Sequence, residues 1–289
     1  MLVVVGDLVE DIVVWRTGSL QEDTDNPAVI TRAGGGSGAN TAAAVAKDAP
    51  VRFIGRVGED AIGVHLADAL SGEGVDVRVQ RSGRTGAIVI LVDENGERTM
   101  FPDRGASVEL SSIDESWFEG MTWLHFTFYG FESASSEQAL LEASRLAHRC
   151  GVPISVDLSS VAVIHSLGRV KVLSLLDEVC PSVIFANRQE AQSVALRELA
   201  ESLDVVCVIK QGVDPVLVLD SGKAELIPTV PVPNVKDTTG AGDAFSAGYL
   251  RAAVANLSAV DCALAGVKAA AEVLSHPGGR VLKNIEKIA

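Results

Sequence analysis

The stretch VKDTTGAGDAF, from Val235 to Phe245, carries the most information about the fold and chemistry of this 289-residue chain. Apolar residues recur at helical spacing directly after it, so Gly240 and Gly242 are expected at the start of a helix. The first backbone N–H groups of a helix have no partner within it, and the helix dipole favours an anion there. Two glycines let a ligand come close to the backbone. The pattern therefore predicts an anion-binding turn.

Asp243 follows within the first turn of the same predicted helix. A carboxylate there has a simple structural explanation, because it complements the helix dipole. Beside an anion site, however, it repels a phosphate unless a cation is present or a proton has to be taken up. That combination suits phosphoryl transfer, in which a base orients and deprotonates the attacking hydroxyl.

Strands and helices alternate along most of the chain. Short apolar strands are expected at residues 2–6, 51–55, 123–128, 152–156, 182–185 and 205–209. Helices are expected at residues 39–48, 61–70 and 135–148, and from 238 to 274 with a break near 256–258. This alternation is typical of βαβ units, so the predicted fold class is α/β, with a mostly parallel sheet covered by helices on both faces.

Two segments do not fit the alternation. Residues 8–32 contain strand-like pieces without a convincing helix, and residues 84–101 have the pattern of a hairpin that turns at Asn95-Gly96. Together they predict a small antiparallel sheet beside the main one. A two-stranded unit alone is only marginally stable, so this sheet has to pack on the main sheet or on another subunit.

The composition limits the partners. The net charge of −14 argues against a nucleic-acid partner, although a small anionic ligand stays open because it responds to a local field. No apolar run approaches the ~18 residues that span a bilayer, and no basic segment of a signal peptide precedes Asp7. Four cysteines lie far apart without a CxxC pair and are expected to be reduced. We therefore expect a cytoplasmic protein with no membrane partner.

Two glycine-rich segments carry a resemblance to a known family. DTTGAGDAFSAGYL resembles the second characteristic motif of the ribokinase-like (PfkB) carbohydrate kinases, and GGGSGANTA at 34–42 resembles the first. Other similar segments follow the family's order: GDLVED at 6–11, GRVGEDAIG at 55–63, NRQE at 187–190 and KQG at 210–212. The resemblance spans nearly the whole chain. It implies a ribokinase-like three-layer α/β/α fold and an ATP-dependent transfer of a phosphoryl group to a hydroxyl, in particular a hydroxymethyl group, of a sugar.

The resemblance assigns the catalytic centre to the glycine turn. In the family, the residues that match Gly240, Ala241 and Gly242 supply the N–H donors of an anion hole, and the match of Asp243 is the general base. Such donors, together with Mg²⁺, stabilise the charge on the phosphoryl oxygens. The residues that match Asp237 and Thr239 help to bind a monovalent cation, K⁺, in ribokinases.

The family's substrate-binding positions fall on four residues near the N-terminus: Asp11, Gly35, Gly36 and Asn40. A carboxylate can accept two hydrogen bonds from sugar hydroxyls at once and so fix the orientation of a ring. Arg104 is a further candidate, because a guanidinium suits a carboxylate or phosphate on the substrate. The alternatives for Arg104 are an ion pair with Asp103 or a solvated side chain.

The nucleotide side is assigned to the second half of the chain. Asn187 and Glu190 match the family's NxxE motif, and their spacing also fits a helix capping box; both roles can hold. We expect Glu190 to act on Mg²⁺ through bound water, because this ion tends to keep its waters. Lys210, Gly212 and Gly278 are implied as further nucleotide-binding positions.

The same resemblance fixes the expected domain organisation. Residues 1–289 would form a single kinase domain, with a lid made of approximately residues 8–33 and 84–103. A closed lid excludes water, which competes with the sugar as phosphate acceptor. Lids of this family often pair, so we expect a homodimer formed through the lid.

Three other functions compete with a sugar kinase. GGGSGA at 34–39 fits the dinucleotide-binding fingerprint, but residues 8–32 separate it from the first strand, and GAGD at 240–243 stays unexplained. A nucleoside kinase of the same family fits all the motifs. So does a non-catalytic sugar- or nucleotide-sensing protein on the same scaffold. The sequence favours a ribose-like or ketose sugar over a nucleoside and leaves sugar acids and phosphosugars open.

Overall fold

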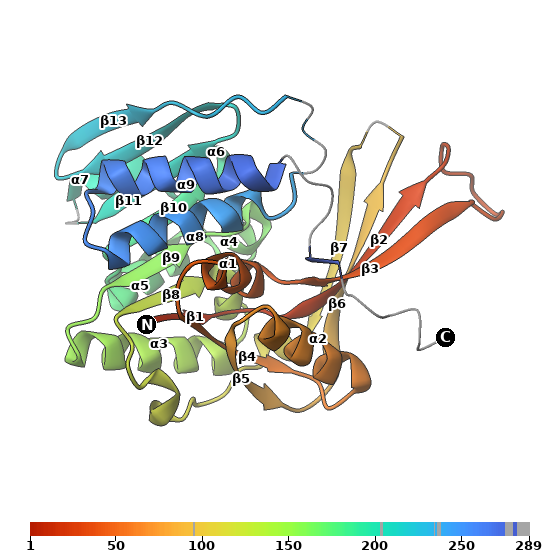
Figure 1. The fold of residues 1–289 in the computed structure, drawn as a ribbon, viewed down its shortest axis with the longest axis horizontal. Coiled ribbons are helices and arrows are strands. Elements are labelled where there is room, and N and C mark those ends of the chain that lie inside the picture. Colours follow the sequence, from red (N-terminus) through yellow and green to blue (C-terminus); the bar gives the residue numbers. More distant parts are fainter. Residues whose placement is uncertain (95, 203–204, 234, 236–237, 275–279, 282–289) are drawn as a thin grey trace.

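The computed structural model describes residues 1–94, 96–202, 205–233, 235, 238–274 and 280–281 (Figure 1). A nine-stranded sheet forms the main body, in the order β13-β12-β11-β10-β9-β8-β1-β4-β5. Its strands are β1 (Leu2–Val5), β4 (Val51–Val57), β5 (Asp76–Arg81), β8 (Trp123–Thr127), β9 (Ile154–Asp157), β10 (Val183–Asn187), β11 (Val206–Gln211), β12 (Asp214–Asp220) and β13 (Lys223–Ile227). The pairings from β5 to β11 are parallel, and β12 and β13 add antiparallel strands at one edge. The predicted α/β class is confirmed.

Helices cover both faces of this sheet. The side chains of β1 alternate, so that Val3 and Val5 join one core cluster while Leu2 and Val4 join the other. One cluster lies under α3 (Ala134–Arg149), α4 (Val161–Leu167), α5 (Arg169–Val179), α6 (Arg188–Val194) and α7 (Leu196–Ser202). The other lies under α1 (Ser37–Ala46), α2 (Ala61–Gly72), α8 (Ala241–Val254) and α9 (Ala259–Leu274). These two cores make the three-layer α/β/α arrangement that the sequence predicts.

A second, smaller sheet projects from the main body (Figure 1). Its order is β14-β3-β2-β6-β7, formed by β2 (Val9–Arg16), β3 (Ala28–Gly35), β6 (Thr85–Val92), β7 (Arg98–Gly105) and the two-residue β14 (Arg280–Val281). The expected hairpin is β6–β7, and residues 8–32 form a second antiparallel pair, β2–β3. Where the two pairs meet, β2 and β6 are parallel, so the sheet is not wholly antiparallel as predicted. The small sheet is therefore built from the two segments that break the main alternation.

The register of the small sheet sorts its side chains onto two faces. Alternate residues of a strand point to the same side, so Asp11, Arg98 and Arg104 share one face. The opposite face carries apolar residues from all four of its longer strands: Ile12, Val14, Ile30, Val89, Leu91 and Phe101. This opposite face also carries Glu10 and Arg32, which pair with each other at 2.9 Å.

Most of the expected elements lie within a few residues of their predicted bounds. The long C-terminal helical block is indeed two helices, with α8 ending at Val254 and α9 starting at Ala259. The predicted helix at residues 39–48 starts earlier, at Ser37, directly after the N-cap residue Gly36. None of the helices in the described ranges combines the length and apolar content needed to cross a bilayer.

Candidate active site

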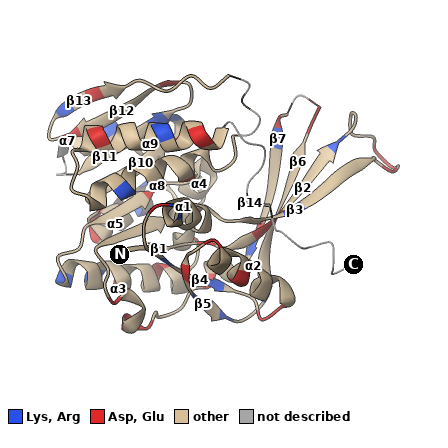
Figure 2. Cartoon of the chain, viewed as in Figure 1, with Lys and Arg blue, Asp and Glu red and all other residues tan. Residues whose placement is uncertain are grey.

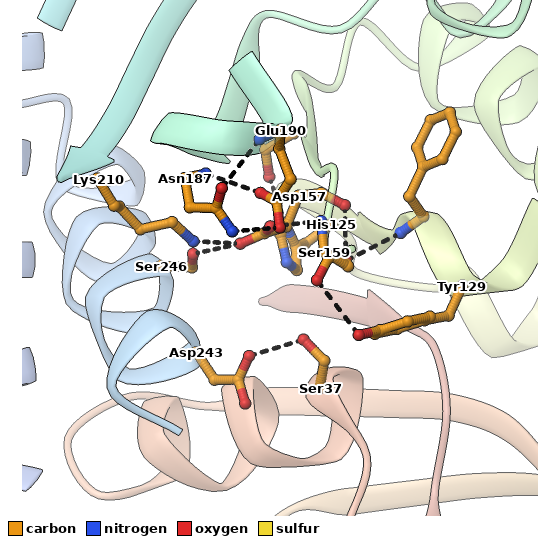
Figure 3. A network of polar contacts seen from close by, with 12 residues as sticks. Ser37, His125, Tyr129, Asp157, Ser159, Asn187, Glu190, Lys210, Asp243 and Ser246 are labelled. Atoms are coloured by element: carbon orange, nitrogen blue, oxygen red, sulfur yellow. Dashed lines mark hydrogen bonds and ion pairs between the residues drawn. The ribbon is translucent and has the colours of Figure 1, made fainter. Parts of the chain in front are cut away.

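Asp243 lies where two helices begin close together. It occupies the first turn of α8, and two residues at the start of α1 hold its carboxylate. Ser37 Oγ donates to Oδ1 at 2.6 Å (Figure 3). Asn40 Nδ2 donates to Oδ2 at 3.0 Å. Desolvation by the surrounding protein raises the pKa of Asp243 to about 6, although the two hydrogen bonds oppose the rise. The carboxylate is thus oriented, and it is ionised at neutral pH.

The glycine turn precedes Asp243 as the sequence predicts. Gly240 is the N-cap of α8, with a φ of 74° in the left-handed region that favours glycine. The N–H of Ala241 donates to the carbonyl of Thr238 at 3.3 Å. Next to it, Arg98 of β7 donates to the hydroxyl of Thr239. The small sheet therefore reaches the glycine turn through an arginine side chain.

The first glycine motif brings β1, β2 and α1 close together. A Cβ at Gly36 would lie 2.3 Å from the carbonyl oxygen of Asp7, and the φ of Gly36 is 99°. A Cβ at Gly35 would lie 2.2 Å from the carboxylate of Asp11. Gly36 therefore requires glycine, whereas a side chain at position 35 would force the Asp11 carboxylate to move. As a result, Asp11 is packed against the backbone that leads into α1.

Lys210 lies beneath the glycine turn in a buried network. Its Nζ is 2.7 Å from Oδ2 of Asp157 and 3.5 Å from where a Cβ of Gly242 would be. Ser246 Oγ, on the same helix as Gly242, donates to the same oxygen of Asp157 at 3.1 Å (Figure 3). Burial disfavours the charged form of Lys210, but the carboxylate of Asp157 outweighs it and holds the pKa of Lys210 above its usual value. The site therefore contains a fixed ammonium group next to the helix start.

Asn187 and Glu190 form the expected capping box at the start of α6. Asn187 Oδ1 accepts from the backbone N–H of Glu190 at 2.9 Å, and the Glu190 carboxylate accepts from the backbone N–H of Asn187 at 2.7 Å. Burial raises the pKa of Glu190 to about 7, and the neighbouring Asp157 carboxylate adds to the rise. In the register of the sheet, Asn187 lies directly beside Lys210.

Arg104 is neither solvated nor paired with Asp103. Its Nη1 is 3.0 Å from Oδ2 of Asp7 and its Nε is 2.9 Å from Oε2 of Glu132. The guanidinium also stacks over the ring of Tyr129, 3.5 Å from the ring centroid. Asp103 instead pairs with Arg84. Both alternatives considered for Arg104 are therefore wrong, because two more deeply buried carboxylates compete for its charge.

The structure describes most of the predicted site residues. Asp243, Asn40, Lys210 and the glycine turn come together at the starts of α1 and α8, while Gly212 lies in the exposed turn after β11. Gly278 and Asp237 lie outside the described residues.

Several residues of the site were missed in the sequence. Ser37 stands within the first glycine motif, and Asp7 and Asp157 stand at the carboxyl ends of β1 and β9, where α/β proteins place their ligands. Those positions were a usable signal. Ser246, Glu132 and Tyr129 carry no local pattern that distinguishes them.

Comparison with known proteins agrees with this geometry. Residues 1–285 match the model of the pfkB family carbohydrate kinase. The chain is 28% identical over 257 residues to a fructokinase of Vibrio alginolyticus, covering 82% of both chains. It is 31% identical over 229 residues to an ATP-dependent ribose-1-phosphate kinase of Halopiger xanaduensis, covering 76% of this chain and 73% of the relative.

Solved structures include close matches to the fold. The adenosine kinase of Sinorhizobium meliloti superposes with a TM-score of 0.84 at 25% identity, covering 100% of this chain and 99% of that one. The relatives thus differ in the acceptors that their names give.

Proposed function

The chain belongs to the pfkB family of carbohydrate kinases, and we propose that it transfers the terminal phosphoryl group of ATP to a hydroxymethyl group of a sugar, with Asp243 as the general base. It is a kinase, and its substrates are ATP and a small sugar or nucleoside. The observation that carries the proposal is the oriented carboxylate of Asp243, held by Ser37 and Asn40 at the N-terminus of α8.

The proposed base has the properties that the step requires. With a pKa of about 6, Asp243 is mostly ionised at pH 7 and still accepts a proton as the acceptor hydroxyl attacks. Hydrogen bonds from Ser37 and Asn40 fix the orientation of its carboxylate. The hydroxyl loses its proton to Asp243 as its oxygen bonds to the phosphorus, and ADP leaves with the electrons of the broken P–O bond.

The charge that develops on the phosphoryl group requires fixed donors. We assign this role to the backbone N–H groups of Gly240, Ala241 and Gly242, with Lys210 on the nucleotide side. In the present conformation the N–H of Ala241 is engaged by Thr238 at 3.3 Å, a long contact that a phosphate oxygen can replace. Gly212 and Gly278 complete the proposed nucleotide-binding positions.

The donor set fits a magnesium ion carried by the nucleotide. No group of three or more His, Cys, Asp or Glu gathers into a metal site among the described residues. We therefore assign the ion to the ATP phosphates and water, with Glu190 and Asn187 contacting its water shell. Bound magnesium neutralises charge on the phosphates and polarises the transferred group. Thr239 and Asp237 are the proposed positions for K⁺.

The acceptor is proposed to lie under the small sheet. Asp11, Gly35, Gly36 and Asn40 are its proposed contacts, since Asp11 sits on the inner face of β2 and against Gly35. A nucleoside acceptor is the second candidate, because an adenosine kinase shares the fold over the full chain. The third alternative, a non-catalytic sensor, is disfavoured because the family and the named relatives are kinases.

The proposed domain organisation follows the two sheets. Residues 1–289 form one kinase domain, and the small sheet, at about 8–33 and 84–103, acts as a lid over the acceptor. β6 contains no charged residue, whereas β2 and β7 carry charged side chains (Figure 2). On the outer face of this lid, Ile30 and Phe101 are more than half exposed, which favours a homodimer formed through the lid.

ADP release tests the proposed function. We would measure it from Mg-ATP across sugars, sugar acids, phosphosugars and nucleosides, for the wild type and for Asp243→Asn. Turnover of one acceptor that falls by about 10²-fold or more in Asp243→Asn, with ATP binding retained, would support Asp243 as base. Asp261→Asn is a matched control, because Asp261 also lies in the first turn of a helix, α9. Near-normal turnover in Asp243→Asn would remove Asp243 from this role.

A further inference from the structure

The charge state of the acceptor can be argued from the cations on the acceptor side. Two arginines lie on the inner face of the small sheet, Arg98 and Arg104. Arg98 contacts Thr239 at the glycine turn, which is the phosphoryl end of the site. Within the described residues of this face, Arg104 is thus the arginine that lies away from the phosphoryl end of the site.

Arg104 lies close to the proposed base through a short chain of contacts. Asp7, its partner, accepts from the backbone N–H of Gly38 through Oδ1 at 3.1 Å. Gly38 is in the first turn of α1, the turn that supplies Ser37 and Asn40 to Asp243. Arg104, through Asp7, and the proposed base Asp243 are therefore both linked to the first turn of α1.

The positive charge of Arg104 is already offset by two carboxylates of the protein. Asp7 is 3% exposed and contributes one carboxylate at 3.0 Å, and Glu132 contributes another at 2.9 Å. The ring of Tyr129 covers the face of the guanidinium at 3.5 Å, so that the arginine side chain is only 12% exposed. One cation between two carboxylates is a group with an excess of negative charge.

Other carboxylates on this side add to that excess. Asp11 shares the inner face with Arg104 and is 8% exposed, and Asp243 carries a negative charge at neutral pH. An incoming phosphate or carboxylate would have to displace Glu132 from Arg104 or lie beside these groups in a partly desolvated site. Like charges that are brought together where water is largely excluded repel strongly.

From these contacts we propose that the acceptor is an uncharged polyol, and that the site discriminates against phosphosugars and sugar acids. This rests on the proposed kinase function and narrows its substrate class. Carboxylates suit the hydroxyls of a neutral sugar, because each oxygen accepts hydrogen bonds from them. The chain would then differ in acceptor charge from the ribose-1-phosphate kinase to which it is 31% identical.

Matched pairs of acceptors test the proposal. We would measure kcat/KM by ADP release for D-ribose against ribose 1-phosphate, for D-fructose against fructose 1-phosphate, and for an aldose against its aldonic acid. We expect every anionic member to be at least about 100-fold poorer than its neutral partner. An anionic member that is equal or better would overturn the proposal while leaving the kinase function intact.

Absence of turnover with every acceptor would count against the kinase function, but it would not decide between neutral and anionic acceptors. In that case calorimetric binding of the same pairs decides the preference, and tighter binding of the anionic members would overturn it. Neutral members that bind more tightly would support it.

One variant links the preference to Arg104. Glu132→Gln keeps the size of the side chain and removes one of the two carboxylates that pair with Arg104. We expect the ratio of anionic to neutral kcat/KM to rise by about tenfold or more in this variant. Glu137→Gln, which removes the ion pair with Lys171 on α5, is the matched control and should leave the ratio unchanged. An unchanged ratio in Glu132→Gln would overturn the assignment to Arg104.

Discussion

Lys210 and Asp157 form an ion pair of 2.7 Å although they are 53 residues apart in the chain. They stand near the carboxyl ends of β11 and β9, with β10 between them. Both side chains are largely withdrawn from water, with 16% and 7% exposed. Burial opposes the charge on each, but mutual attraction lowers the pKa of Asp157 and raises the pKa of Lys210. The pair is therefore charged, and each partner depends on the other.

We expect Asp157→Asn to destabilise the fold by about 3 kcal/mol, because it leaves a buried ammonium without its counter-ion. The loss should be largest near neutral pH. It should shrink as the pH rises, because burial without Asp157 disfavours the charged form of Lys210 in the variant and the amine can lose its proton. Urea unfolding from pH 7 to pH 10 measures this.

The control for this prediction is Asp214→Asn. Asp214 pairs with Arg188 on the surface, with both side chains half exposed. Such pairs contribute about 1 kcal/mol or less, so the control should change stability little. Equal losses of unfolding free energy in the two variants would contradict the larger cost expected for breaking the buried ion pair.

Ser37→Ala should shift the pH dependence of activity upward. Ser37 donates to Asp243 and stabilises its ionised form, which limits the rise of its pKa to about 6. Without this donor the pKa of Asp243 is higher, so the acid limb of kcat/KM moves to higher pH. The activity at pH 6 falls more than the activity at pH 8, where both enzymes keep Asp243 ionised.

A pH–rate profile of the wild type, Ser37→Ala and a control serine variant checks this. Ser193→Ala is suitable, because Ser193 Oγ donates to a backbone carbonyl within α6. An acid limb that stays in place in Ser37→Ala would mean that the limb does not report Asp243.

Glu190→Gln should flatten the dependence of stability on pH in the absence of magnesium. The pKa of Glu190 is about 7 in the folded state, above its unfolded value of 4.5. Its contribution to stability is present below pH 4.5 and is lost as the pH rises through 7. Glutamine cannot ionise, and it keeps an acceptor for the N–H of Asn187.

Denaturant unfolding at pH 5 and pH 8 compares the two proteins. The wild type should lose more stability between these pH values than Glu190→Gln does. Asp243 contributes to the loss in both, so the difference between the two proteins isolates Glu190. Glu198 is exposed at the start of α7, so Glu198→Gln should show the same pH dependence of stability as the wild type. Parallel curves for Glu190→Gln would contradict the raised pKa.

The main sheet could be predicted because its strands are short apolar runs separated by amphipathic helices. β1 and β11 are of this kind, and the glycine turn located α8. β5 was missed because its sequence DVRVQR lies at the sheet edge, half exposed, and so lacks an apolar run. Local patterns locate elements, and they fail where an element is stabilised mainly by its neighbour.

The side-chain partners in the site were harder to predict than its position. The carboxylate of Asp243 was predicted as base, but its donor Ser37 is 206 residues away in the chain. Arg104 and Asp7 are separated by 97 residues. Which cation meets which carboxylate depends on burial and on competing partners, and neither is visible in a local pattern.

Phe101→Glu should break the proposed dimer. On the outer face of the small sheet, Ile12, Val89 and Phe101 lie opposite one another in the register, and Phe101 is 54% exposed. A carboxylate within an apolar contact between two copies loses its hydration without gaining a partner, so association weakens. We expect the wild type to have the mass of a dimer, and Phe101→Glu that of a monomer, by light scattering after size exclusion.

Val170→Glu replaces an apolar residue that is 84% exposed on α5 and should leave the dimer intact. A wild type that is monomeric at all concentrations, or a dimer that survives Phe101→Glu, would contradict association through this face.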